Sequence, residues 1–225
     1  MNFTFLEKTF KTRQFADDDD FLLDIIGQLP NHARVLEVGA HFGKFSHHLL
    51  ERFPQALIIE GDPSSYNVLC EKFFDAKDKI MNHVIYNDEK EHNWFWASKA
   101  QSNALIMPLE QPKSRGLIKS RVKTISLDSI DFNFDFIKTD CEGADFRILQ
   151  GAERLLDKNR PLIYFEHSGE IGAMNHNYTK DIFFNFFDTK KYKLITTKSE
   201  QFSPHMWFTD LKQKSNSYNL LAIPK

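Results

Sequence analysis

The architecture follows from residues 35–43, which have the sequence Val-Leu-Glu-Val-Gly-Ala-His-Phe-Gly. An apolar strand is expected over residues 35–38, a glycine turn follows it, and residues 42–53 suit a helix. Because glycine has no Cβ, the backbone of such a turn can bend sharply and approach a ligand closely. The N–H groups that open the helix then face the same site. With this order of strand, turn and helix, α/β proteins bind nucleotide-like cofactors.

Two carboxylates accompany the turn, and the spacing of its glycines is informative. Gly39 and Gly43 are separated by three residues, whereas a dinucleotide-binding turn has the spacing Gly-x-Gly-x-x-Gly. Glu37 lies inside the strand, and a carboxylate near the end of a strand usually faces a ligand or a cation. Glu60 ends the next expected strand and could accept hydrogen bonds from ribose hydroxyls. Both carboxylates suit a site for S-adenosylmethionine (SAM), and a glycine turn that serves packing alone is the alternative.

Length and composition are those of one globular domain. A chain of 225 residues can bury one large core, and 41% hydrophobic and 27% charged residues are ordinary values. The formal net charge of -2 provides no basic field for nucleic acid or an anionic membrane. Cys70 and Cys141 have no metal-ligand spacing, so we expect packed thiols in a reducing compartment. Without an apolar run suited to a signal peptide or a membrane span, we expect a cytoplasmic protein.

Strands and helices are expected to alternate along the chain. The acidic run at residues 17–20 can cap a helix over residues 17–29, within an N-terminal helical extension over residues 1–33. Further helices are expected at residues 42–53, 66–74, 144–156 and 182–187, and strands at residues 35–38, 56–60, 80–86, 94–96, 121–125, 134–139, 161–165, 192–197 and 218–223. Residues 97–120 have little pattern and are expected to form a loop or lid. The alternation predicts a mostly parallel sheet covered on both faces, with the last two strands paired as a hairpin.

A second group of polar residues is expected at the same edge of this sheet. Residues 139–145, Thr-Asp-Cys-Glu-Gly-Ala-Asp, place three carboxylates where a strand gives way to a helix. Glu166 and His167 follow the next apolar strand. Because ligands of open α/β sheets bind outside the carboxyl ends of the strands, both segments should meet the turn at Gly39 in one crevice. Asp145 is expected only to cap the helix that it precedes.

Several blocks of sequence together resemble one enzyme family. Residues 138–152 have the sequence Lys-Thr-Asp-Cys-Glu-Gly-Ala-Asp-Phe-Arg-Ile-Leu-Gln-Gly-Ala, residues 125–130 are Ile-Ser-Leu-Asp-Ser-Ile, and residues 160–166 are Arg-Pro-Leu-Ile-Tyr-Phe-Glu. These blocks resemble the FkbM family of SAM-dependent methyltransferases, which has a Lys-Ile-Asp-Val-Glu-Gly-Ala block, a Leu-Asp-Ser element and a proline–strand–glutamate segment. The resemblance covers residues 34–167, with a closing segment at residues 218–224. Gly61-Asp62 departs from it, since the family often has proline directly after the glutamate.

The resemblance implies a fold and a reaction. The fold would be a class I SAM-methyltransferase, a Rossmann-like three-layer α/β sandwich with a mostly parallel sheet and a C-terminal antiparallel hairpin, in a single domain over residues 1–225. The reaction would transfer the methyl group of SAM to a hydroxyl of a sugar in a glycan, a glycolipid or a related natural product. The protein must then hold the acceptor oxygen in line with the methyl–sulfur bond and take up a proton.

The same resemblance assigns residues to these tasks. The residues implied to bind the cofactor are Glu37, Gly39, Ala40, His41 and Gly43 for the methionine part, Glu60 for the ribose, and Asn82 and His83 for the adenine edge. The candidates for the base or for positioning the acceptor are Asp140, Glu142, Glu166 and His167. Asp140 has the best expected position and is the first candidate for the base, and Glu166 is the second. Among the four, His167 has the ordinary pKa best suited to a base at neutral pH.

Other interpretations stay open. A divalent Mg²⁺ or Ca²⁺ ion held by Asp140, Glu142 and Glu166 would also activate a hydroxyl, but we do not favour a metal site. A binding module with this fold and no catalysis would keep the same glycines and carboxylates. A nicotinamide-dependent oxidoreductase is disfavoured by the glycine spacing, and a nucleic-acid methyltransferase by the charge. The sequence implies no oligomeric state.

Overall fold

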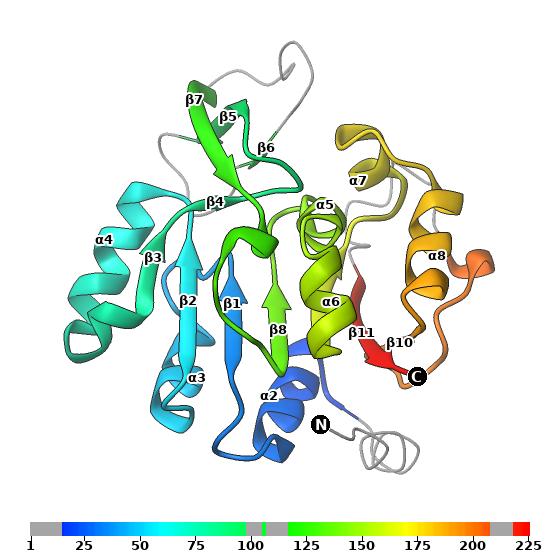
Figure 1. The fold of residues 1–225 in the computed structure, drawn as a ribbon, viewed down its shortest axis with the longest axis horizontal. Helices are drawn as coiled ribbons and strands as arrows, with labels where there is room; N and C mark the ends of the chain where they lie inside the picture. The colour runs from blue at the N-terminus through cyan, green and yellow to red at the C-terminus, as the bar shows by residue number, and fades with distance from the viewer. Residues whose placement is uncertain (1–14, 98–104, 107–116, 208–217) are drawn as a thin grey trace.

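A seven-stranded sheet forms the centre of the computed structural model, which describes residues 15–97, 105–106, 117–207 and 218–225. The strand order is β10-β11-β9-β8-β1-β2-β3 (Figure 1). The strands are β1 (Val35–Val38), β2 (Ala56–Glu60), β3 (Ile80–Asn82), β8 (Phe136–Thr139), β9 (Leu162–His167), β10 (Tyr192–Thr196) and β11 (Tyr218–Pro224). Strands β1, β2, β3, β8 and β9 are parallel, and β11 is antiparallel to both β9 and β10. The predicted mostly parallel sheet with a C-terminal antiparallel hairpin is confirmed.

Helices cover both faces of this sheet (Figure 1). They are α2 (Asp18–Gln28), α3 (Ser46–Arg52), α4 (Pro63–Lys72), α5 (Asp145–Gln150), α6 (Glu153–Asn159), α7 (Gly169–Asn175) and α8 (Lys180–Thr189), with short 3₁₀ turns η1 (Phe74–Lys79), η2 (Leu127–Ser129) and η3 (Pro204–Met206). One buried cluster joins the sheet to α2, α3 and α4 and includes Phe21 and Leu49. The other joins it to α5, α6 and α8 and includes Phe146 and Phe183. The predicted three-layer α/β sandwich is therefore confirmed.

Helix α2 begins where the acidic run predicts. Asp17 is its N-cap residue, and the carboxylate of Asp17 accepts a hydrogen bond from the N–H of Asp20 at 2.9 Å. Phe21, Leu22 and Ile25 of this helix are fully buried. The described part of the predicted N-terminal extension is thus an integral layer of the fold, and residues 1–14 lie outside the described residues.

A second, four-stranded sheet lies beyond the carboxyl ends of β1, β2 and β8, at the top of Figure 1. Its order is β4-β7-β5-β6, with β4 (Val84–Ile85), β5 (Glu91–Ala97), β6 (Leu105–Ile106) and β7 (Leu117–Ile125). The predicted loop or lid over residues 97–120 is wrong where β5 ends, where β6 forms and where β7 begins; residues 98–104 and 107–116 lie outside the described residues. The reason is that β5 and β7 pair through their backbones from Glu91↔Lys123 to Ala97↔Leu117, which needs no hydrophobic pattern.

Two other element predictions differ from the structure, and one helix was missed. The strand expected at residues 80–86 is two strands, β3 and β4, which belong to different sheets. The helix expected at residues 144–156 is broken into α5 and α6 at Gly151, where a Cβ would lie 2.4 Å from the carbonyl oxygen of Tyr86. Helix α7 was not predicted. No helix within the described ranges is long and apolar enough to cross a membrane.

Candidate functional site

The carboxyl ends of β1, β2 and β8 meet around the glycine turn, and this area is termed the mouth. Gly39 has a φ of +80°, and a Cβ on it would lie 2.1 Å from the carbonyl oxygen of Asp140. Gly43 has a φ of +75°, and a Cβ there would lie 2.6 Å from the ring of Phe73. Ala40 between them is buried. Gly39 therefore lets the ends of β1 and β8 approach each other, whereas Gly43 lets the turn pack against the end of α4.

Glu60 joins the turns that follow β1 and β2. One carboxylate oxygen of Glu60 accepts a hydrogen bond from the N–H of His41 at 2.6 Å, and the other accepts one from the N–H of Asp62 at 2.7 Å. Burial raises the pKa of Glu60, and the two N–H donors oppose this shift. The side-chain amide of Asn82 donates to the backbone carbonyl oxygen of Glu60 at 2.8 Å. Asn82 therefore supports the turn after β2. Each oxygen of Glu60 retains a lone pair for a further donor.

A buried ion pair lies beneath the mouth. Oε1 of Glu37 is 3.2 Å from Nζ of Lys138, and Oε2 of Glu37 accepts a hydrogen bond from the hydroxyl of Ser46 at 2.6 Å. The same ammonium lies 3.6 Å from Oδ2 of Asp140 and 5.2 Å from the centre of the Phe45 ring. Burial alone would lower the pKa of Lys138, but the charges of Glu37 and Asp140 raise it well above its ordinary range. Lys138 is therefore protonated, and both oxygens of Glu37 are engaged inside the protein.

Sequence reasoning assigned no role to Lys138 or Ser46. A signal was present, because Glu37 and Lys138 each interrupt a short apolar strand and these strands were expected to be parallel. In the structure Glu37 and Lys138 are paired across β1 and β8. Once β1 and β8 are known to be neighbours, the two opposite charges inside them predict this ion pair.

His41 adopts a left-handed backbone conformation with a φ of 52°. Its ring lies 3.8 Å from that of Phe42, centre to centre. Burial lowers the pKa of His41, and the nearby charges of Asp62 and Asp140 oppose this shift. Its Nε2 atom is buried and has no hydrogen-bond partner within the described residues. His83, the other histidine predicted to bind the cofactor, is exposed after β3.

The segment after β8 carries Asp140 and Glu142 at the surface and Asp145 inside. The side chain of Asp140 is 47% exposed. Glu142 has a left-handed φ of 53°, and partial burial together with the charge of Asp140 raises its pKa. Asp145 is fully buried and accepts a hydrogen bond from the N–H of Cys141 at 3.2 Å; burial raises its pKa to about 7. Asp145 therefore holds this segment from inside, and the expectation that it only caps the helix is wrong, since no side chain caps α5.

Glu166 and His167 point to opposite faces of the sheet, because successive strand residues alternate. His167 is 1% exposed, and its ring lies 4.7 Å from those of Phe183 and Trp207 and 5.2 Å from that of Phe202. Burial among these rings lowers the pKa of His167 to about 3. Glu166 is partly buried and points to the face that α2 covers.

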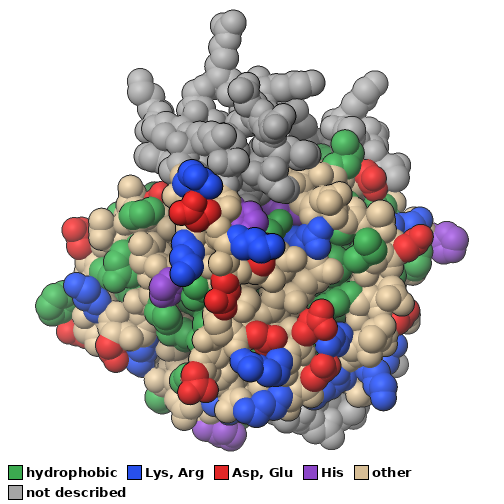
Figure 2. Space-filling view, turned by 45° about the horizontal axis from the view of Figure 1, so that its top comes forward, with side chains coloured by type: hydrophobic (Ala, Val, Ile, Leu, Met, Phe, Trp, Pro, Cys, Tyr) green, Lys and Arg blue, Asp and Glu red, His purple; other side chains and the backbone are tan. Residues whose placement is uncertain are grey.

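The structure thus gathers most of the predicted site residues but not all of them. At the mouth it brings together Glu37, Gly39, Ala40, His41, Gly43, Glu60 and Asp140, with Glu142 beside them. His167 lies instead within the aromatic cluster on the α8 face. Across the described ranges, no group of three or more His, Cys, Asp or Glu side chains is arranged to hold a metal ion. Figure 2 shows the molecule with the top of Figure 1 turned forward, and acidic and basic side chains are interspersed over the described part of that view.

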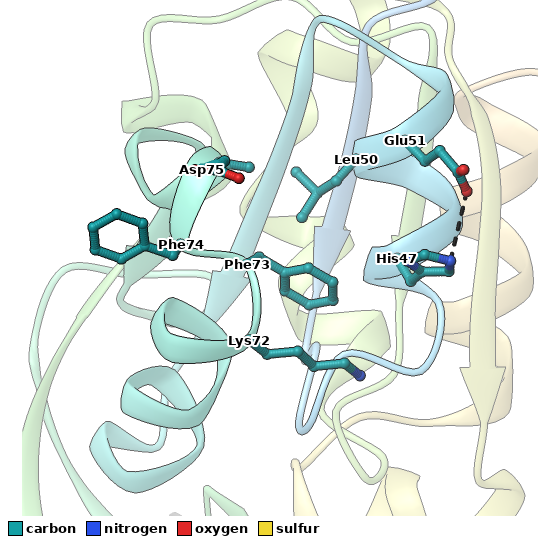
Figure 3. A pocket seen from close by; sticks show the side chains of 8 residues that line it. His47, Leu50, Glu51, Lys72, Phe73, Phe74 and Asp75 are labelled. Atoms are coloured by element: carbon teal, nitrogen blue, oxygen red, sulfur yellow. Dashed lines mark ion pairs between the residues drawn. The ribbon is translucent and has the colours of Figure 1, made fainter.

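A shallow hollow of about 260 Å³ lies between α3 and residues 72–76 (Figure 3). His47 and Glu51 of α3 form one wall, and their side chains lie 3.5 Å apart. The ammonium of Lys72 donates to the carbonyl oxygen of Phe42 at 3.0 Å, so the hollow borders the outer side of the glycine turn. None of the predicted site residues lines it.

A family model and two solved structures are similar to this chain. A model of the methyltransferase FkbM domain matches residues 37–193, well over half of the chain. The solved structure of the methyltransferase FkbM from Methylobacillus flagellatus KT is similar with a TM-score of 0.53 at 16% identity, over 96% of this chain and 57% of that chain. A putative O-methyltransferase from Klebsiella pneumoniae has a TM-score of 0.50 at 14% identity, over 97% of this chain and 86% of that chain. No curated protein sequence matches.

At such low identities the two solved structures show a shared fold and no more, and this chain spans 57% of the Methylobacillus protein. The match to the family model is the stronger finding, because it includes both the turn at Gly39 and the block at residues 138–152. It confirms the resemblance found in the sequence. The chain belongs to the family of methyltransferase FkbM domains.

Proposed function

We propose that this protein is a SAM-dependent O-methyltransferase that acts on a hydroxyl of a sugar in a glycan, a glycolipid or a related natural product. Methyl transfer follows from the family. The observation that carries the proposal is the placement of two carboxylates, Glu60 and Asp140, on either side of the Gly39 turn.

Three features of the mouth fit SAM. Glu60 has unused lone pairs beside the turn, which suits a ribose diol. The carboxylate of Asp140 is half exposed, which suits a cationic group. The buried Nε2 atom of His41 has no partner within the described part of the chain, so a ligand at the turn would supply one.

Bound SAM supplies an electrophilic methyl group, and the protein must supply position and a proton acceptor. We assign the proton of the acceptor hydroxyl to Asp140, because its carboxylate is accessible at the carboxyl end of β8. Glu166, partly buried near the carboxyl end of the neighbouring strand β9, is the second candidate, and we assign Glu142 to orient the acceptor. We do not assign the proton to His167, because its burial and a pKa of about 3 leave it a weak base away from the mouth.

A neutral hydroxyl acceptor is consistent with the charges near the mouth. Asp140 and Glu142 lie at the surface there, and the chain has a net charge of -2. Both would repel a polyphosphate backbone. A sugar or a related polyol carries no such charge, which favours it over nucleic acid as the acceptor.

Calorimetric titration of wild-type protein and Glu60→Ala with SAM, its demethylated product and NAD tests the cofactor. We expect SAM and its product to bind and the substitution to weaken both by about tenfold or more, since it removes a charged hydrogen-bond acceptor. Binding of NAD alone would favour the oxidoreductase instead. Labelled SAM with a panel of sugars then tests transfer, and SAM binding without transfer to any acceptor class would favour the binding module.

A further inference from the structure

The ammonium of Lys138 lies between two carboxylates with different surroundings. Glu37 is 1% exposed and is bound on one oxygen by Lys138 and on the other by Ser46. Asp140 has one oxygen 3.6 Å from the same ammonium, and its side chain is 47% exposed. Both oxygens of Glu37 are therefore bound inside the protein. Asp140 has one oxygen near the ammonium, and its side chain is still accessible to solvent.

We propose that Lys138 is a positioning residue that holds the carboxylate of Asp140 at the mouth, and that Asp140 rather than Glu37 faces the sulfonium of the cofactor, which is also where the acceptor hydroxyl must lie. This rests on the proposed SAM-dependent function and goes beyond it. It assigns a role in cofactor binding to a lysine that is 2% exposed and cannot itself touch a ligand.

The position of the ammonium is fixed from several sides. Lys138 is paired with Glu37 across β1 and β8, and the Phe45 ring lies 5.2 Å from its Nζ. The backbone at Asp140 is fixed as well, because its N–H donates to the carbonyl oxygen of Val38 at 3.1 Å. An exposed aspartate would otherwise sample several side-chain rotamers. Holding one oxygen inward aims the other outward, so the site is preorganised for a cation.

The test is a double-mutant cycle on the SAM dissociation constant, with Lys138→Met, Asp140→Asn and the double variant. If Lys138 acts through Asp140, each single substitution weakens SAM binding by about tenfold, and the double variant binds SAM as weakly as Asp140→Asn alone. Losses that multiply in the double variant would overturn the proposal. So would wild-type affinity in Lys138→Met.

A matched control is Lys190→Met. Lys190 also lies between two carboxylates, Glu153 at 3.3 Å and Asp157 at 2.8 Å, but far along the chain from the mouth. Its substitution should leave the SAM dissociation constant unchanged. If Lys138→Met does not fold, Glu37→Gln/Lys138→Met removes both buried charges together, and the same cycle with Asp140→Asn gives the same two outcomes.

A ligand without a positive charge separates positioning from a general structural defect. 5′-Methylthioadenosine keeps the adenosine part of SAM but carries no cationic group, so Lys138→Met should bind it as tightly as the wild type does while its SAM affinity falls by about tenfold. An equal loss of affinity for both ligands would overturn the proposal. Absence of SAM binding by the wild type would overturn the proposed function as well, which distinguishes the two failures.

Discussion

Lys138 and Lys190 each lie between two carboxylates, but their surroundings differ. The side chains of Lys138 and Glu37 are 3% and 1% exposed. Lys190 is 10% exposed, but its partners Glu153 and Asp157 are 61% and 62% exposed. Water can replace the partner of an exposed charge, and it cannot reach a buried one. The comparison teaches that each buried charge at the ends of β1 and β8 depends on its partner, whereas the charges beside α6 can be solvated separately.

The largest effect is expected for Lys138→Met. Loss of the ammonium leaves Glu37 buried without a counter-charge, so the free energy of unfolding should fall by about 3–5 kcal/mol. Urea denaturation followed by circular dichroism measures it. Glu37→Gln/Lys138→Met should recover most of the loss, because it buries no net charge. A loss below about 1 kcal/mol for the single variant would mean that water reaches Glu37.

Asp145 sharpens the comparison, because it is a buried carboxylate hydrogen-bonded to a neutral N–H instead of an ammonium. Its pKa is about 7 in the folded protein against an ordinary 3.8, so the folded state binds the proton more tightly than the unfolded state. Stability contributed by this group should therefore fall as the pH rises from about 4 toward about 7, and level off above that. The unfolding free energies of wild type and Asp145→Asn, measured across this range, should differ in slope. Parallel curves would contradict the prediction.

The smallest effect is expected for Lys190→Met. Its two ion pairs have exposed carboxylates, so the free energy of unfolding should fall by no more than about 1 kcal/mol, and by less at high salt. The same urea titrations, run at low and high salt, measure it. A loss as large as that of Lys138→Met would show that burial does not separate the two lysines.

Local patterns predicted the parts of the fold that depend on local chemistry. Strand β2 has the predicted bounds, and the helix expected over residues 17–29 is capped by Asp17. The break at Gly151 was missed because it depends on a contact with Tyr86, which is distant in the sequence. The second sheet was missed for a similar reason, since β7 owes its length to pairing with β5.

The position of the site was also predictable from local patterns, but the contacts that depend on strand pairing were not. Glycines and carboxylates at strand ends indicated the mouth, and Glu60 and Asp140 lie there. The sequence placed Glu166 and His167 together, but strand alternation sends them to opposite faces. Lys138 belongs to a family motif, but its role was not predicted, because its ion pair depends on which strand lies beside β8.

The Glu37–Lys138 pair also has a consequence for how the chain assembles. Strands β1 and β8 are parallel neighbours, although their sequences are far apart, and closing such a long loop is slow. Apolar residues alone would tolerate a shifted alignment of the two strands. A slip by one residue would bring Lys138 beside Leu36 or Val38 and leave two unpaired charges in the dry interior. The buried ion pair thus destabilises any shifted alignment of the two strands. The alignment that it favours is the one that also places Asp140 beside Gly39.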